Sequence, residues 1–135
     1  MHFVDTNVLL YSVSPDPAES RKLSIARALL RDSTFMLSVQ VLQEFYVQAT
    51  RSSRPGRLTH EHAVGLIMAW SRMPVQELTA DIVLRSTAAS QRFQISYWDA
   101  AVIEAARTAG CSTVLSEDLN HGQNFDGVTV VNPFR

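Results

Sequence analysis

Short apolar segments of strand length alternate with longer helical segments along the whole chain, and this alternation constrains the fold more than any other feature. Neighbouring residues within the strand segments are often both apolar, a pattern typical of strands in a sheet that is covered on both faces. The strand candidates are residues 2–5, 34–37, 75–78, 112–115 and 128–131.

Two helices are predicted in each gap between the first four strands. They cover residues 6–11 and 18–31, then 39–51 and 60–72, and then 80–93 and 97–110. Ser38, Thr59 and Ser96 stand where a helix N-cap is needed. The order β-α-α-β-α-α-β-α-α-β-β predicts an α/β three-layer sandwich, with a mainly parallel sheet of roughly five strands flanked by helices. The length of 135 residues is that of one domain, which we expect to span residues 1–135.

Two aspartates follow strand segments directly. Asp5 ends the first strand, and Asp118 comes just after the strand at residues 112–115. Sites in open parallel sheets form outside the carboxyl ends of the strands, so both positions favour chemistry. Each also has an ordinary explanation, because Asp5 can cap the following helix and Asp118 lies in a segment rich in turn-forming residues.

Asp99 lies at the start of a predicted helix and in line with its buried face. Val102, Ile103 and Ala106 stand three, four and seven residues further on, which places all four side chains on one side. An ionised group at the top of a buried face needs a partner or a cation. The competing explanation is a capping box, in which Asp99 reaches back to the backbone N–H of Ser96.

Glu44 lies off the centre of the apolar stripe on its helix, and a solvated glutamate is the usual interpretation of such a position. The combination of acidic residues is more informative than any single one. Carboxylates that share a pocket repel each other unless a cation neutralises them. A ligand set made only of oxygen atoms suits Mg²⁺, or Mn²⁺ as a substitute. The positions of Asp5, Asp99 and Asp118 therefore make these three aspartates the candidate site, and the pattern alone does not add Glu44.

Four segments give the chain a resemblance to a known family. They are Val4-Asp5-Thr6-Asn7-Val8, Gln43-Glu44-Phe45, Trp98-Asp99-Ala100 and Leu115-Ser116-Glu117-Asp118-Leu119-Asn120. In this order and at this length, the chain resembles the PIN-domain ribonucleases, and among them the VapC-type toxins of bacterial toxin–antitoxin pairs.

The resemblance implies roles for particular residues. Asp5, Asp99 and Asp118 would hold Mg²⁺, and Glu44 would complete the acidic set. Asn7 and Ser116 would support these ligands from a second layer. The implied reaction is endonucleolytic hydrolysis of RNA that leaves 5′-phosphate and 3′-hydroxyl ends, and the implied partners are an RNA substrate, a small antitoxin protein and a second copy of the chain in a homodimer.

Glu117 is an acidic neighbour of Asp118, and the offset from the strand favours Asp118 as the ligand, with Glu117 facing solvent. Beside Asp99, Tyr97 and Trp98 could stack against a base, although core packing is expected, at least for Trp98. The basic residues of one loop, Arg51, Arg54 and Arg57, form either a rim that contacts RNA phosphates or a solvated loop.

The net charge of −1 carries no global signature of nucleic-acid binding. One cysteine, Cys111, excludes an internal disulfide. The chain has no apolar run long enough to span a membrane and no visible leader, so a cytoplasmic location is expected.

Two alternatives remain open. The first is a haloacid-dehalogenase-like phosphotransfer enzyme with Asp5 as nucleophile, but Asn7 replaces the second aspartate of that pattern. The lysine that such an enzyme needs late in the chain is also missing, because Lys22 is the only lysine. The second alternative is a PIN-like module that binds RNA or protein without cleaving it.

Overall fold

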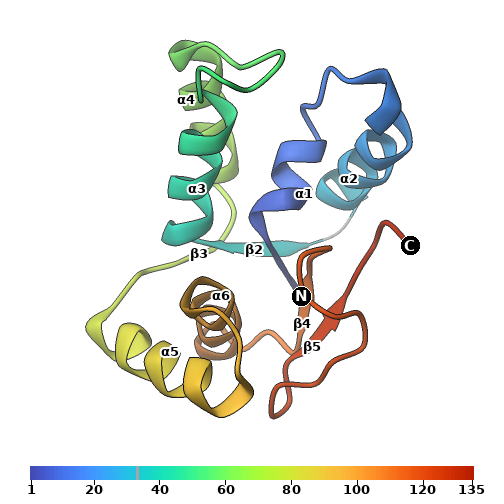
Figure 1. Ribbon diagram of the computed structural model, residues 1–135. Coiled ribbons are helices and arrows are strands. Elements are labelled where there is room, and N and C mark those ends of the chain that lie inside the picture. The colour runs from blue at the N-terminus through green and yellow to red at the C-terminus, as the bar shows by residue number, and fades with distance from the viewer. Residues whose placement is uncertain (33) are drawn as a thin grey trace.

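A five-stranded sheet forms the middle layer of the protein, which we describe from a computed structural model covering residues 1–32 and 34–135 (Figure 1). The strands lie in the order β3-β2-β1-β4-β5, and every neighbouring pair is parallel. This confirms the mainly parallel sheet expected from the sequence. The strands are β1 (His2–Val4), β2 (Phe35–Ser38), β3 (Val75–Gln76), β4 (Thr113–Leu115) and β5 (Thr129–Val131).

The helices form the two outer layers. Figure 1 shows α1 to α4 on one side of the sheet and α5 and α6 on the other. The helices are α1 (Thr6–Tyr11), α2 (Ser20–Asp32), α3 (Val39–Ala49), α4 (His60–Trp70), α5 (Ala80–Phe93) and α6 (Tyr97–Thr108), with a 3₁₀ turn η1 (Pro17–Glu19) before α2. The expected caps Ser38, Thr59 and Ser96 each accept a backbone N–H of the helix that follows.

The structure differs from the sequence-based expectation mainly at element ends. Strand β3 has two residues instead of four, because its partner β2 ends at Ser38, which already caps α3. The helix expected from residue 18 begins as the 3₁₀ turn η1. There Asp16 caps the backbone N–H of Ala18, and Pro17 supplies a first position that needs no N–H.

The register of β1 and β4 determines where the candidate site forms. These adjacent parallel strands pair Val4 with Leu115, and both end at these residues. The backbone N–H of Asp5 still donates to the carbonyl of Leu115 at 3.1 Å. The residues after the two strands, Asp5 and Ser116, therefore emerge side by side at one edge of the sheet.

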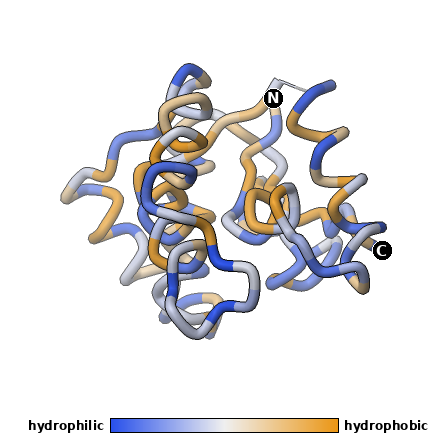
Figure 2. The backbone as a smooth tube through the Cα atoms, turned by 90° about the horizontal axis from the view of Figure 1, so that it is seen from above, coloured by the Kyte–Doolittle hydropathy of each residue, from blue (hydrophilic) through white to orange (hydrophobic). Residues whose placement is uncertain are grey.

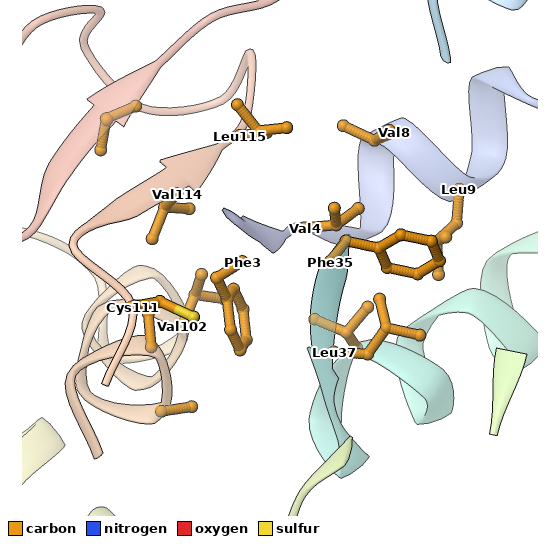
Figure 3. Packing of buried hydrophobic residues seen from close by; sticks show 14 of the residues in the cluster. Phe3, Val4, Val8, Leu9, Phe35, Leu37, Val102, Cys111, Val114 and Leu115 are labelled. Carbon is orange, nitrogen blue, oxygen red and sulfur yellow. The ribbon is translucent and has the colours of Figure 1, made fainter. Parts of the chain in front are cut away.

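Alternate residues of each central strand fill the two halves of the core (Figure 3). In β1, Phe3 points toward Val102 of α6, and Val4 points toward Val8 of α1. Phe3, Val4 and Val8 are each at most 1% exposed. Burial on both sides holds β1 between the two helical layers, and with it the position at which Asp5 leaves the sheet.

Helix α2 is amphipathic. Figure 2 shows hydrophobic and hydrophilic bands alternating along α2, which covers the core with one side and meets solvent with the other. Within the part of the chain that the structure describes, no helix is long and apolar enough to cross a membrane.

The loop after α3 packs against the segment after α1 through Gly56, and this contact provides a test of the fold. Gly56 has φ +66°, and a Cβ there would lie 2.3 Å from Cγ of Pro15. Gly110 also has positive φ, +80°, but a Cβ there would meet open space. We predict that Gly56→Ala lowers the free energy of unfolding by about 1–3 kcal/mol more than Gly110→Ala, because only Gly56→Ala adds overpacking to backbone strain. Urea denaturation measures both, and equal losses would contradict the packing of this loop.

Candidate functional site

Asp5 is the most deeply buried of the candidate acidic residues, with 5% of its surface exposed. It caps α1, and its Oδ1 accepts the backbone N–H of Thr6 at 2.7 Å. Its Oδ2 accepts the hydroxyl of Ser116 at 2.8 Å. The pKa of Asp5 is raised from 3.8 to about 6, mainly by burial and in smaller part by the nearby charges of Asp118 and Glu44, while these two hydrogen bonds lower it.

Ser116 and Asn7 connect Asp5 to the loop that carries Asp118. The buried Ser116 hydroxyl donates to Asp5 and accepts the side-chain amide of Asn7 at 3.0 Å and the backbone N–H of Asp118 at 3.1 Å. The Asn7 amide nitrogen also approaches Oδ2 of Asp118 at 3.2 Å, and its oxygen accepts the backbone N–H of Glu117 at 3.3 Å. The first turn of α1 is thereby joined to residues 116–118.

Glu117 and Asp118 point to different surroundings. Asp118 is exposed at the candidate site, where its carboxylate meets Asn7. Glu117 instead pairs with Lys22 at 2.8 Å and accepts the hydroxyl of Tyr11. The expectation that Glu117 faces solvent is therefore wrong, because the only lysine of the chain holds it on the outer side of α1 and α2.

Glu44 reaches the site through two hydrogen bonds that the sequence did not suggest. Its Oε2 accepts the hydroxyl of Thr6 at 3.0 Å, and its Oε1 accepts the side-chain amide of Gln40 at 2.9 Å. The position of Gln40 four residues before Glu44 is the signal that could have indicated this pair, since such residues share one face of a helix. The glutamate is half-buried and directed at α1, unlike a solvated residue on an outer face.

Asp99 lies at the start of α6, at the same edge of the sheet. The Ser96 hydroxyl accepts the backbone N–H of Asp99 at 3.1 Å, which is the forward bond of a capping box. Among the described residues, no bond from the Asp99 carboxylate back to the N–H of Ser96 is found. Burial raises the pKa of Asp99, a hydrogen bond with the Ser96 side chain lowers it, and the charges of Asp118 and Glu44 raise it. The charges of Asp118 and Glu44 therefore act on both Asp5 and Asp99.

No cationic side chain among the described residues forms an ion pair with this acidic group. Among residues 1–32 and 34–135, the ion pairs are formed by other side chains, and none involves Asp5, Glu44, Asp99 or Asp118. In the same part of the chain, no three acidic, histidine or cysteine side chains are close enough to enclose an ion as they stand. Carboxylates without a counter-charge repel each other. The oxygen-only set fits Mg²⁺ or Mn²⁺ by its chemistry.

The other candidate residues lie at different places in the fold. Arg51, Arg54 and Arg57 follow the C-terminal end of α3, the end away from the sheet, and Arg51 stands about two helical turns beyond Glu44. Trp98 is 64% exposed beside Asp99, so the expectation that it packs in the core is wrong. Its ring meets the edge of Tyr97, with the two ring centres 5.1 Å apart.

Comparison with known proteins gives one family. The family model described as "PIN domain" matches residues 2–124, which is most of the chain. No curated protein matches the chain by sequence.

Solved structures that resemble the chain come from toxin–antitoxin systems. A FitAB complex bound to an IR36 DNA fragment has a TM-score of 0.73 at 18% identity, with 100% of this chain and 96% of the other covered. A toxin–antitoxin complex from Klebsiella pneumoniae has a TM-score of 0.70 at 20% identity, with 98% of each chain covered. VapC20 from Mycobacterium tuberculosis, described as a Sarcin-Ricin loop cleaving toxin, has a TM-score of 0.64 at 22% identity, with 87% of this chain and 92% of the other covered. At these identities the likeness establishes the fold.

The raised pKa of Asp5 predicts a specific dependence of stability on pH. The folded protein binds a proton at Asp5 up to about pH 6, whereas the unfolded chain releases it near 3.8. The metal-free protein should therefore lose stability as the pH rises from about 4 to 6, by up to about 3 kcal/mol from this group. Asp5→Asn should remove this loss, so that the stability of the variant relative to wild type increases with pH.

Urea denaturation in EDTA at pH 4.5 and 7 measures the difference. Asp81→Asn is the control, because Asp81 is an exposed carboxylate on α5 that pairs with Arg85. For each variant, the free energy of unfolding is compared with that of wild type at the two pH values. If this difference changed with pH no more for Asp5→Asn than for Asp81→Asn, Asp5 would not have the raised pKa described here.

Proposed function

We propose that this chain, which belongs to the PIN domain family, is an Mg²⁺-dependent endoribonuclease and the toxin of a toxin–antitoxin pair. One observation carries the proposal most strongly. Asp5 and Asp99 both have a raised pKa, both are affected by Asp118 and Glu44, and no basic side chain of the described residues is paired with any of the four. A divalent cation is the partner that such a group of carboxylates lacks.

In this proposal Asp5, Asp99 and Asp118 hold the ion, with Mn²⁺ as a substitute, and Glu44 completes the acidic set. The ion would supply Lewis-acid activation of water and charge stabilisation at the RNA phosphorus. The protein would hold the ligand oxygens in position. The Thr6 N–H and the Ser116 hydroxyl occupy one lone pair on each oxygen of Asp5 and leave the remaining lone pairs available.

Asn7 and Ser116 act as supporting residues that orient Asp5 and Asp118 relative to each other. Supporting hydrogen bonds of this kind fix the direction of a ligand oxygen before the ion binds. Arg51, Arg54 and Arg57 would contact phosphates of the RNA at a distance from the cleaved bond, since a substrate with one charge per nucleotide must approach an acidic centre.

The phosphotransfer alternative loses support from the surroundings of Asn7 and Lys22. Asn7 stands where that pattern has its second aspartate, and its side-chain amide is engaged with Ser116 and Asp118. Lys22, the only lysine, is paired with Glu117 and has the Tyr11 ring 4.7 Å from its nitrogen.

The proposed partners come from the structural neighbours. These neighbours include toxin–antitoxin complexes, three of which are described as bound to DNA. We propose a cognate antitoxin, a homodimer and a cytoplasmic location for this chain as well. Light scattering should then give twice the chain mass of 15.0 kDa, and induced expression in a bacterial host should arrest growth. A monomer contradicts the dimer, and growth equal to that of an Asp5→Asn strain contradicts the toxin role.

Cleavage of structured RNA tests the enzymatic proposal. With Mg²⁺ the wild type should cleave, and Asp5→Asn, Asp99→Asn and Asp118→Asn should each lose at least about 100-fold in rate, because activation by the ion is worth several kcal/mol. Asp81→Asn removes a carboxylate from the exposed side of α5 and should cleave like wild type.

The same assay has two results that would contradict the proposal. Cleavage that survives EDTA would exclude the role of the ion. Equal cleavage by wild type and the three site variants would show that the activity comes from elsewhere. Binding of RNA without any cleavage in Mg²⁺ or Mn²⁺ would instead favour the non-catalytic binding module.

A further inference from the structure

Gln40 is a buried polar residue whose side-chain hydrogen bonds, among the described residues, lead to the acidic site. It stands in the first turn of α3 and is 6% exposed. Its amide nitrogen donates to Oε1 of Glu44 at 2.9 Å and to the backbone carbonyl of Trp98 at 3.4 Å. One side chain thus connects the helix that carries Glu44 to the first turn of the helix that carries Asp99.

The chemistry of the two partners explains why an amide is found at this position. Both the Glu44 carboxylate and the Trp98 carbonyl are acceptors, so only the NH₂ end of Gln40 can face them, with one hydrogen for each. The shorter bond, to a charged acceptor, is the stronger of the two. A leucine, methionine or glutamate of similar size would fill the space but donate nothing.

The second oxygen of Glu44 is held separately by the Thr6 hydroxyl at 3.0 Å. With one donor on each oxygen, the carboxylate of Glu44 is fixed in direction as well as in place. Gln43, on the same helix, is exposed and makes no side-chain hydrogen bond among the described residues. The burial of Gln40 is therefore not a general property of glutamines on α3.

We propose that Gln40 is a positioning residue for the reaction, which acts by orienting the Glu44 carboxylate. This inference rests on the proposed ribonuclease function. Removal of a hydrogen-bond partner from the second layer of a metal site lowers activity by about 10–100-fold in general, and a similar loss is expected here.

The test compares Gln40→Met with Gln43→Met in single-turnover cleavage of RNA with Mg²⁺. Gln40→Met should lower the cleavage rate constant at least about 10-fold with little change in the RNA concentration at half-maximal rate, and Gln43→Met should equal wild type. Gln40→Asn keeps the amide but is one methylene too short to reach both partners. Gln40→Asn should lower the cleavage rate constant by a similar factor, and it replaces Gln40→Met in the test if the methionine variant fails to fold.

A double-mutant cycle with Glu44→Ala separates positioning from a general loss of structure. If Gln40 acts through Glu44, then adding Gln40→Met to Glu44→Ala should change the rate less than about 2-fold. A defect in folding would lower the rate by the same factor in both backgrounds, and that result would overturn the proposal. If cleavage by Glu44→Ala is too slow to measure, the same double-mutant cycle can be built from the Mn²⁺ dissociation constants of the variants, measured by calorimetry.

The possible failures are distinguishable. If wild type neither cleaves RNA nor binds Mn²⁺, the proposed function is wrong and the role of Gln40 with it. If wild type is active and Gln40→Met and Gln40→Asn match Gln43→Met, the proposed function stands and only the positioning role is refuted.

Discussion

The rest of the site depends on the hydrogen bonds of the Ser116 hydroxyl. A serine hydroxyl has one hydrogen to donate and two lone pairs that accept, and here the hydrogen goes to Asp5 and the lone pairs to Asn7 and the backbone of Asp118. All three hydrogen bonds can form because β1 and β4 are adjacent, parallel and equally long, so that their ends coincide. One small side chain thereby couples the sheet, the first turn of α1 and the loop of Asp118.

The acidic centre makes the folded state less stable than it would be with neutral residues there. Asp5 is buried with a pKa of about 6, and the charges of Asp118 and Glu44 act on both Asp5 and Asp99. Proteins retain such unfavourable groups where function requires them. A bound cation would remove the repulsion, so binding of the ion and folding of this edge of the sheet should reinforce each other.

The fold was largely predictable because its signals are local. Periodicity, caps such as Ser38 and the alternation of strands and helices all point to a covered parallel sheet, and Asp5 and Asp118 follow from the rule that strand ends meet at one edge. The hydrogen bond between Thr6 and Glu44, the pairing of Glu117 with Lys22 and the exposure of Trp98 depend on how separate elements pack. They involve residues distant in sequence, and no local pattern encodes them.

The central claim is that these carboxylates form one site completed by a divalent cation. Its most direct test is an anomalous difference map from crystals of the protein grown with Mn²⁺. The account predicts a peak within coordination distance of oxygens from Asp5, Asp99 and Asp118, with these side chains drawn closer together than in the metal-free protein. A map with no peak at this edge of the sheet, at a Mn²⁺ concentration that supports cleavage, would contradict it.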